Sequence, residues 1–488
     1  MSNFLYNSHM ENIFWQNIAI VFAYFVLSVG SAVHILIHKD DIKSSIGWIA
    51  LVFLSPFIGV ILYIFFGINR VKRKGTKLRN KKTSPDAALK KDAGLLFGNI
   101  PLHCESFIKY GYNVYPQKFT FGNSVIPLQN GIQSYPEMAE AVKNAKKEVL
   151  VESYIFDSDP ETDKLIEAFK TAIANGACVK VLIDAIGTLK IFKESIEKKL
   201  SKVKGLEYGV FLPFHFPYTF SLFNLRNHRK IMLIDSQTAF FGGMNLAMAN
   251  TLTGDAEKGI IDITFKVEGP VVEQLKRVFE DDWEFVKKKK LHSRACFTPN
   301  SENAQTGIPA RIIPDGPDSE SGKIELLVQG MINFASKKIL IITPYFLPEN
   351  NILTALEMAV MRGVNVEIII PQKSNHKIIP WATEPNFLRL ASKGVKIYMT
   401  PPPFDHSKIF VTDDEKVLVG SSNWDVRSFK LLFEADMEII SKDIAKQLTE
   451  IAEEKKKKAK QFDITASKNL PFLKRLRNNA CRLITPYY

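Results

Sequence analysis

Cysteine is scarce in this chain and follows no pattern. The 488 residues contain four, at positions 104, 178, 296 and 481, with neither the C-x-x-C spacing of a zinc site nor the density of a disulfide framework. A glycine-rich loop of the kind that cradles nucleotide phosphates is also lacking. The sequence therefore does not support zinc, ATP-driven or redox chemistry, and it fits a reducing cytoplasmic environment.

Long apolar runs are absent except near the N-terminus. Among residues 18–37, His34 is the only Asp, Glu, Lys, Arg or His, and residues 46–68 contain no charged residue. Both runs exceed the roughly 18 residues that a helix needs to cross a bilayer. Only HKDDIKSS separates them, which favours a spanning or re-entrant hairpin over two buried core helices. The first 16 residues lack Lys and Arg, so a cleaved signal peptide is a poor fit.

Acidic residues are outnumbered, and the formal net charge is +13. This charge suits either nucleic acid or an anionic membrane, and the two apolar runs favour the membrane and argue against nucleic acid. Directly after the second run, RVKRKGTKLRNKK carries eight Lys or Arg and no acid. The positive-inside rule therefore predicts that the large C-terminal part lies in the cytoplasm, with the basic run adhering to anionic lipid.

One pattern of polar residues occurs twice. The stretches NHRKIMLIDSQTAFFGGMN and DHSKIFVTDDEKVLVGSSN carry His, Lys, Asp and Asn at the same relative offsets. The two sets are His228, Lys230, Asp235 and Asn245, and His406, Lys408, Asp413 and Asn423. Two imidazoles beside two ammonium groups and two amides suit a reaction in which one histidine attacks an anionic phosphodiester and the other protonates the leaving alcohol.

Spacing predicts the local geometry of each copy. Because side chains alternate along a strand, His228 and Lys230 share a face, whereas Asp235 points to the other face and lies roughly 23 Å along the strand. We interpret Asp235 and Asp413 as turn formers whose carboxylates bond their own backbone. A hairpin folded at each turn would set the Asn of each copy directly across from its His.

The repeat extends upstream of both hairpins. Short runs rich in Val and Ile, such as CVKVLIDAIG and NVEIIIPQ, alternate with helical stretches near residues 163–175 and 351–362. This alternation is typical of buried parallel strands with crossover helices. It predicts two α/β halves that pack together and bring both hairpins into one site, with a linker near residues 298–309.

These residues resemble the phospholipase D superfamily and, more narrowly, bacterial cardiolipin synthases. The resemblance rests on the two H-x-K-x-x-x-x-D stretches, each followed by G-x-x-N, and on RNHRK, ITPYFLPE and GSSNWDVRSFKLLFE. It implies an α/β fold with two similar phospholipase D-like sandwich halves forming one active site, preceded by a two-helix transmembrane hairpin. The implied reaction transfers a phosphatidyl group between two phosphatidylglycerol molecules, releases glycerol, and uses no metal or cofactor.

The resemblance also implies roles for particular residues. His228 falls on the nucleophile and His406 on the general acid and base, with each motif's Lys and Asp counted among the catalytic set and each motif's Asn binding phosphate. An acidic residue downstream of each motif orients its histidine. The matching positions are Asp262 and Glu434.

Several alternatives stay open at this stage. Attack by one histidine on the phosphodiester would give a phosphohistidine, and water could resolve it, which would make the protein a phospholipase or a nuclease. A noncatalytic membrane scaffold is a third class. Phosphatidylethanolamine could replace one phosphatidylglycerol as donor, and the sequence leaves the oligomeric state open. The expected division of the chain is a transmembrane hairpin at 1–69, a basic linker at 70–115, halves at 116–297 and 310–450, and a basic tail at 451–488, in the bacterial plasma membrane.

Overall fold

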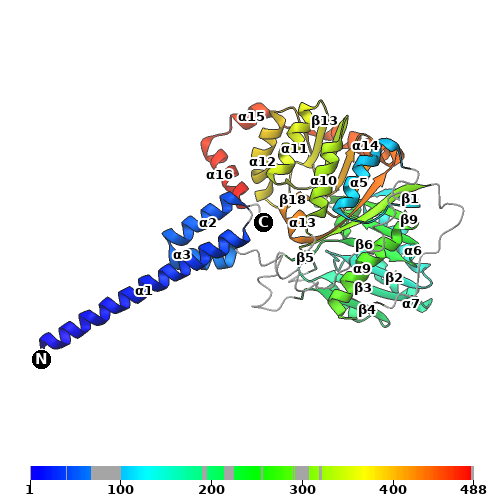
Figure 1. Cartoon of the computed structure of the whole chain (residues 1–488). Coiled ribbons are helices and arrows are strands. Elements are labelled where there is room, and N and C mark those ends of the chain that lie inside the picture. The colour runs from blue at the N-terminus through cyan, green and yellow to red at the C-terminus, as the bar shows by residue number, and fades with distance from the viewer. Residues whose placement is uncertain are drawn as a thin grey trace. The chain divides into compact units, whose positions relative to one another are not determined.

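The computed structural model describes residues 2–39, 41–67, 100–188, 195–213, 225–253, 257–289, 291, 307–317 and 321–484. The chain divides into two compact units, Met1–Arg73 and Lys74–Tyr488 (Figure 1). The smaller unit is helical and the larger one is mixed α/β. The basic run at residues 70–82, Cys296 and most of the expected linker at residues 298–309 lie outside the described residues.

The smaller unit is built on a helical hairpin. Helix α1 (Ser2–His38) is followed by α2 (Ile42–Leu54), whose first turn is capped by the Asp41 carboxylate through a backbone N–H at 2.6 Å. The hydroxyl of Ser28 on α1 donates to the carbonyl oxygen of Val52 at 3.1 Å and ties the two helices together. The first apolar run of the sequence is thus helical, as predicted.

The second apolar run, expected as a span at about residues 46–68, is not one continuous helix. Helix α2 ends at Leu54, α3 (Pro56–Leu62) begins two residues later, and a π-helical turn η1 (Tyr63–Gly67) follows. Proline lacks a backbone N–H, so the hydrogen-bond ladder of α2 cannot continue through this point. Among the described residues, only the Phe14–His38 part of α1 is long and apolar enough to cross a membrane by itself.

The larger unit consists of two repeated α/β halves. The strands of the first half are β1 (Thr120–Gln129), β2 (Glu148–Ser153), β3 (Cys178–Asp184), β4 (Leu206–Phe211), β6 (Lys230–Ile234), β7 (Thr238–Gly242) and β9 (Ile263–Glu268). Their counterparts in the second half are β10 (Ile308–Asp315), β11 (Lys338–Ile342), β13 (Asn365–Pro371), β14 (Lys396–Thr400), β16 (Ile409–Thr412), β17 (Lys416–Gly420) and β19 (Leu432–Ile440). Strands β2, β3 and β4, and likewise β11, β13 and β14, pair in parallel as the sequence predicts.

The strand order is mirrored about the middle of the sheet. The first half runs β4-β3-β2-β6-β7-β9-β1, and the second half continues as β10-β19-β17-β16-β11-β13-β14. Strands β1 and β10 pair antiparallel and join both halves into one 16-stranded sheet, which β20 (Lys460–Gln461) extends at the outer edge. Equivalent hairpins, β6–β7 and β16–β17, therefore lie at equivalent places on either side of the junction.

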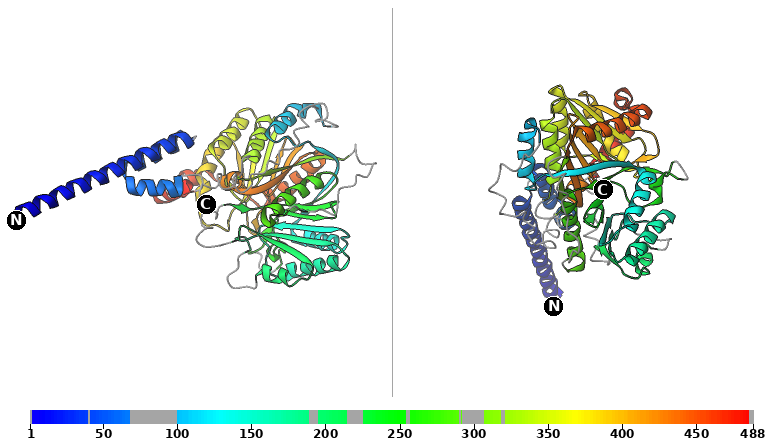
Figure 2. Two further views of the ribbon diagram at one scale, coloured as in Figure 1. Left: turned by 60° about the horizontal axis from the view of Figure 1, so that its bottom comes forward. Right: turned by 90° about the vertical axis from the view of Figure 1, so that its right-hand side faces the viewer.

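Helices cover both faces of each half (Figure 2). In the first half one face carries α6 (Asn130–Lys143), α7 (Pro160–Ala174) and α8 (Ile196–Ser201), and the other carries α9 (Val271–Lys287). In the second half the corresponding helices are α10 (Lys323–Phe334), α11 (Asn350–Met361), α12 (Ile378–Ala391) and, opposite them, α14 (Lys442–Lys458). Helices α7 and α11 confirm the two helical stretches predicted from the sequence.

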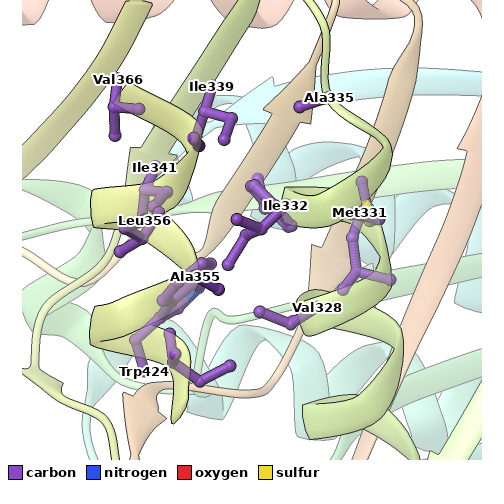
Figure 3. Close-up of a cluster of buried hydrophobic side chains, with 14 of the residues drawn as sticks. Val328, Met331, Ile332, Ala335, Ile339, Ile341, Ala355, Leu356, Val366 and Trp424 are labelled. Carbon is purple, nitrogen blue, oxygen red and sulfur yellow. The ribbon is translucent and has the colours of Figure 1, made fainter. Parts of the chain in front are cut away.

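Burial on both faces explains why the strands are continuous apolar runs. On β11, Ile339 and Ile341 point into the cluster beneath α10 and α11, whereas Leu340 and Ile342 point into the cluster that contains α9 and α14. Figure 3 shows Ile339 and Ile341 facing Ile332 of α10 and other apolar side chains of the first cluster. A strand with one wet face would instead alternate polar and apolar residues.

Two segments beyond the predicted halves also pack on the second half. Helix α5 (Glu105–Val114) comes from the expected linker at 70–115, yet it buries Phe107 in the core that contains α10. Helix α16 (Phe472–Ile484), in the expected tail, packs on α12, where Asn478 donates to Glu384 at 2.7 Å. Part of the expected tail is therefore docked on the larger unit.

The duplicated aspartates do form the hairpin turns, but their carboxylates bond elsewhere than predicted. Asp235 and Asp413 have left-handed φ angles of 54° and 55°. The Asp413 carboxylate accepts from the backbone N–H groups that open β11, at 2.7 to 3.2 Å, and Asp235 does the same for β2 at 2.7 to 2.9 Å. Each Asp therefore ties its hairpin to the neighbouring strand, and these donors hold the pKa of Asp413 below its ordinary value although burial opposes them.

Replacing Asp413 by Ala tests this tie. The matched control is Asp414→Ala, because Asp414 has the same left-handed φ of 54° but a side chain that is 58% exposed. Both substitutions carry the same backbone strain, so their difference isolates the lost hydrogen bonds to the start of β11. We expect Asp413→Ala to lower the free energy of unfolding by about 2 kcal/mol more than the control, measured by denaturant unfolding of the full chain in detergent. Equal losses would contradict the tie.

Candidate active site

Short strand pairs that cross between the halves position both histidines. Strand β5 (Arg226–Asn227) pairs in parallel with the start of β19, and β15 (Phe404–Asp405) pairs in parallel with β8 (Ile260–Ile261). The next residue of each short strand is the histidine. The backbone N–H of His228 donates to Phe433 O at 2.8 Å, and that of His406 donates to Ile261 O at 2.7 Å. Each histidine is therefore attached to the half that does not encode it.

The crossed pairing also selects the acid that contacts each imidazole. His228 Nδ1 lies 3.0 and 3.1 Å from the two carboxylate oxygens of Glu434, and His406 Nδ1 lies 2.8 Å from Asp262 Oδ2. Both acids expected from the sequence are thus at the histidines. The expected pairing within each half is wrong, because each acid directly follows the residue that binds the backbone of the opposite histidine.

A carboxylate at Nδ1 decides which nitrogen of each ring is free to react. We assign the proton of each neutral imidazole to Nδ1, where it donates to Glu434 or Asp262, so that Nε2 keeps its lone pair. Lys408 Nζ also lies 2.8 Å from His406 Nδ1. One Nδ1 cannot donate to Asp262 and accept from Lys408 at once, and the carboxylate is the stronger partner.

The motif lysines turn back onto their own histidines. Lys230 Nζ donates to His228 O, and Lys408 Nζ donates to His406 O. This contact follows from the two-residue spacing, which puts both side chains on one face. Lys230 Nζ also lies 5.4 Å from the ring centroid of Tyr154, whose ring packs edge-on against His228 with centroids 5.0 Å apart.

Burial and like charges depress the pKa values of all four basic groups. Burial and the charges of Lys230 and Lys408 lower the pKa of His228 well below its usual range. Burial, then Lys408, lowers the pKa of His406 to about 4, against its hydrogen bond to Asp262. Burial also lowers the pKa of Lys230 to about 7 and that of Lys408 to about 8. Both imidazoles are neutral at pH 7 in the empty site, and an entering anion would stabilise every added proton.

The carboxyl group beside His228 is deeply buried and well supplied with donors. Burial raises the pKa of Glu434 to about 7, opposed by Lys230 and by the hydroxyls of Ser421 and Ser428. These hydroxyls donate to it at 2.5 and 2.7 Å. With the imidazole N–H, three donors converge on Glu434, which fits an acceptor role. The sequence analysis missed both serines, although they flank the motif Asn423 in GSSNWDVRS.

The motif asparagines lie beyond the hairpin ladders rather than opposite the histidines. In the first hairpin, pairing ends at Ile231↔Phe241, and its register places position 228 level with 244 rather than with Asn245. The three-residue turn shifts the expected register by one. Asn245 Oδ1 accepts from a backbone N–H at 3.2 Å, whereas Asn423 Oδ1 is buried without a hydrogen-bond partner among the described residues.

Comparison with known proteins decides the family. A family profile described as "Cardiolipin synthase, PLD-like domain" matches residues 138–283 and 328–456, and one described as "Phospholipase_D-nuclease N-terminal" matches residues 26–67. The "Cardiolipin synthase" of Clostridium perfringens is 30% identical over 457 residues, which cover 92% of this chain and 95% of that protein. The chain belongs to the cardiolipin synthase family.

Further relatives agree with this assignment. "Cardiolipin synthase 1" of Staphylococcus aureus is 30% identical over 475 residues, covering 92% of each chain, and the "Cardiolipin synthase" of Geobacillus thermodenitrificans is 28% identical over 476 residues, covering 96% of this chain and 92% of that protein. The solved phosphatidylserine synthase of Haemophilus influenzae has the same fold, with a TM-score of 0.59 at 15% identity over 78% of this chain and all of that one.

Membership of the cardiolipin synthase family makes the chain a phosphatidyltransferase. It is membrane-associated and acts on phospholipid, as the sequence resemblance implied. The family match to the larger unit spans both hairpins and both acids at the histidines, and the match to the smaller unit spans most of its helices from within α1 to η1.

One cluster of metal-binding side-chain types occurs among the described residues, away from the histidines. His103, Cys104 and Glu415 bring their ligand atoms within 4.8 Å of one another. Glu415 belongs to the turn of the second hairpin, at the opposite end from His406. The His103 ring already contacts Glu415 at 2.5 Å, and Lys442 lies 3.9 Å from the same carboxylate. This cluster therefore ties the N-terminal part of the unit to the hairpin and has no place in the reaction at the histidines.

Proposed function

We propose that the protein makes cardiolipin by transferring a phosphatidyl group from one phosphatidylglycerol to another, releasing glycerol. The observation that carries the proposal is the crossed pair of histidine–carboxylate contacts, which puts the carboxylate of each pair at Nδ1 and leaves Nε2 to react within one charged site. At His406 the ammonium of Lys408 also lies 3.2 Å from Nε2. The family supports a phosphatidyltransferase, and this geometry supports a two-step reaction through phosphohistidine.

In the first step His228 is the nucleophile. Its neutral Nε2 attacks the phosphorus of the donor lipid, and the bond from phosphorus to the glycerol oxygen breaks as His406 gives that oxygen a proton. Glu434 stabilises the positive charge that develops on the His228 ring. Lys230 and Lys408 stabilise the phosphate oxygens as charge shifts onto them, with amide donors from the motif asparagines Asn245 and Asn423.

In the second step the roles of acid and base reverse. The terminal hydroxyl of the second phosphatidylglycerol gives its proton to His406, its oxygen attacks phosphorus, and the bond from phosphorus to His228 breaks. The neutral imidazole is restored and cardiolipin leaves. The low pKa of His406 in the empty site fits the base role directly. Its acid role requires the anionic phosphate, which raises this pKa when it binds.

We also propose the membrane arrangement and domain division expected from the sequence. Both N-terminal apolar segments would be inserted in the bacterial plasma membrane, giving a multi-pass protein, with the catalytic halves at 116–297 and 310–450 in the cytoplasm. The support is the basic run at residues 70–82, which follows the second segment. Because α2 has only 13 residues before the break at Pro56, α2, α3 and η1 would have to act together as the second span.

A lipid assay tests the proposed reaction. Purified full-length protein in detergent is incubated with phosphatidylglycerol alone, and the lipids and water-soluble products are analysed. We expect cardiolipin and glycerol in equal amounts. Phosphatidic acid as the main product would indicate a hydrolase, and turnover only after addition of phosphatidylethanolamine would indicate a different donor.

Replacing His228 or His406 by Ala should abolish synthesis, and near-normal turnover in either variant would reject the assigned roles.

The crossed contacts predict that Glu434 and Asp262 act on different steps. A phosphatidyl ester of p-nitrophenol has a leaving group that needs no proton, so its first step depends on His228 but not on His406. We expect Asp262→Asn to keep the burst of p-nitrophenolate, and Glu434→Gln to slow it about 100-fold because the charge behind His228 is lost. Stopped-flow absorbance measures the burst. Slowing by Asp262→Asn instead would mean that the acids act within their own halves.

The depressed pKa values predict weaker substrate binding at high pH. A bound phosphate raises the pKa values of His406, Lys230 and Lys408 above those of the empty site, so binding is strongest below the empty-site values and is lost as pH rises through the values in the complex. We expect the KM for phosphatidylglycerol in mixed micelles to rise about tenfold between pH 7 and pH 9. Lys408→Arg, which stays charged, should show a smaller rise. A KM that is constant or falls would contradict this electrostatic account.

A further inference from the structure

Arg427 is a cation beside the candidate active site that neither the motif nor the reaction steps above use. It lies on the short helix α13 (Val426–Lys430), directly after the motif residue Asn423 and β18 (Trp424–Asp425). Its Nε–H is buried without a hydrogen-bond partner, and its guanidinium makes no ion pair with any residue that the structure describes. The charge of this guanidinium is therefore not compensated by an acidic partner, so an anion that reached the guanidinium would bind favourably.

The chain neighbours of Arg427 place it at the histidines. Ser428 donates from its hydroxyl to Glu434, the carboxylate that holds His228, and accepts from the backbone N–H of Asn423. Strand β18 pairs with β12 (Phe346–Leu347), which directly follows Tyr345. Arg427 is thus one residue from a contact to the nucleophile's acid, and the strand before its helix pairs with the strand that follows Tyr345.

A wall of aromatic and polar side chains connects this place with His406. The ring of Tyr345 lies edge-on to His406 with centroids 6.4 Å apart, and 6.0 Å from the ring of His376. The charge of Arg427 acts on two side chains of this wall. After burial, it is the second cause that lowers the pKa of His376, and it opposes the rise in the pKa of Tyr345 that burial produces. The buried carboxyl of Asp425, whose pKa burial raises to about 6, is the nearby acidic group on the same segment.

This cation breaks the twofold pattern of the site. His, Lys and Asn recur in both halves at a constant offset, and at that offset the counterpart of Arg427 is Ala249. The duplicated set surrounds the phosphate that reacts. A cation present at this position in one half alone suits a single negative charge of the ligand that lies to one side of the reacting phosphorus. The acceptor lipid carries such a charge, because its own phosphodiester is three carbons from the hydroxyl that attacks.

We propose that Arg427 binds the phosphate of the acceptor phosphatidylglycerol and thereby selects a lipid alcohol over water in the second step. The inference rests on the proposed function. The guanidinium would donate from its Nη atoms to two phosphate oxygens, holding the acceptor so that its terminal hydroxyl faces His406 and the phosphohistidine at His228. That hydroxyl then loses its proton to His406 as the new oxygen–phosphorus bond forms and the bond from phosphorus to His228 breaks.

Comparing two acceptors tests the proposal. Both assays start from phosphatidylglycerol as donor and share the phosphohistidine. One measures cardiolipin synthesis, whose acceptor carries a phosphate, and the other measures exchange of radiolabelled free glycerol into phosphatidylglycerol, whose acceptor has none. For Arg427→Gln we expect cardiolipin synthesis to fall about 10- to 100-fold, the effect of losing a charged hydrogen bond, and exchange to fall far less. Lys430→Gln is the matched control, because Lys430 is a cation on the same helix that pairs with Glu349 at 2.5 Å on the surface.

The outcomes separate this inference from the proposed reaction. A parallel loss of both activities in Arg427→Gln would mean that the residue binds the donor or supports the fold. Full activity with an unchanged ratio of cardiolipin synthesis to glycerol exchange would mean that Arg427 is not needed for binding the acceptor. Either result overturns this inference without affecting the proposed function. A wild-type protein that exchanges glycerol without forming cardiolipin would overturn the proposed function first. If Arg427→Gln elutes as an aggregate, Arg427→Lys carries the test, since it keeps the charge with fewer donors and should still lower synthesis more than exchange.

Discussion

Neither half of the larger unit carries a complete histidine–acid pair, and this constraint organises the site. The backbone of each histidine hydrogen-bonds to a strand of the opposite half, and the next residue along the chain is the acid at the imidazole. Strand pairing therefore sets the imidazole–carboxylate geometry, because the backbone hydrogen bond already places each imidazole beside its carboxylate. Separating the halves would remove both acids at once, so the β1–β10 junction that joins them serves chemistry as well as stability.

The same arrangement concentrates charge where burial makes it costly. Two histidines, two lysines and two carboxylates are largely withdrawn from water, and the basic groups respond with lowered pKa values. The lowered pKa values mean that the buried carboxylates do not fully compensate the positive charge of the basic groups. In the proposed reaction a phosphodiester would supply the missing negative charge, so that substrate binding and protonation of His406 would be one event. His406 would then gain its proton only when the substrate is bound, and the leaving alcohol of that substrate would receive the proton.

Much of this architecture can be predicted from the sequence, and the failures have physical causes. Apolar runs and a duplicated motif are local patterns, so the halves, their strands and the histidine–lysine spacing were predictable. The crossed pairing was not, because Asp262 and Glu434 are chemically equivalent partners and sequence distance does not say which strand lies beside which histidine. The asparagine register failed because a three-residue turn replaced the expected four. The break in the second apolar run falls at Pro56, where the missing backbone N–H of proline interrupts the helix.

Departures from twofold symmetry matter for a reaction between two molecules of one lipid. A perfectly symmetric site would treat donor and acceptor alike, yet one must lose its headgroup and the other must offer it. The histidines differ in their acids, because Glu434 accepts from the hydroxyls of Ser421 and Ser428, whereas Asp262 accepts from the backbone N–H of Ile263. In addition, Arg427 stands where the first half has Ala249. In the proposed reaction such differences would let two similar halves give different roles to the same lipid. Duplication would then build the phosphate site, and the divergence of a few side chains would give the reaction its direction.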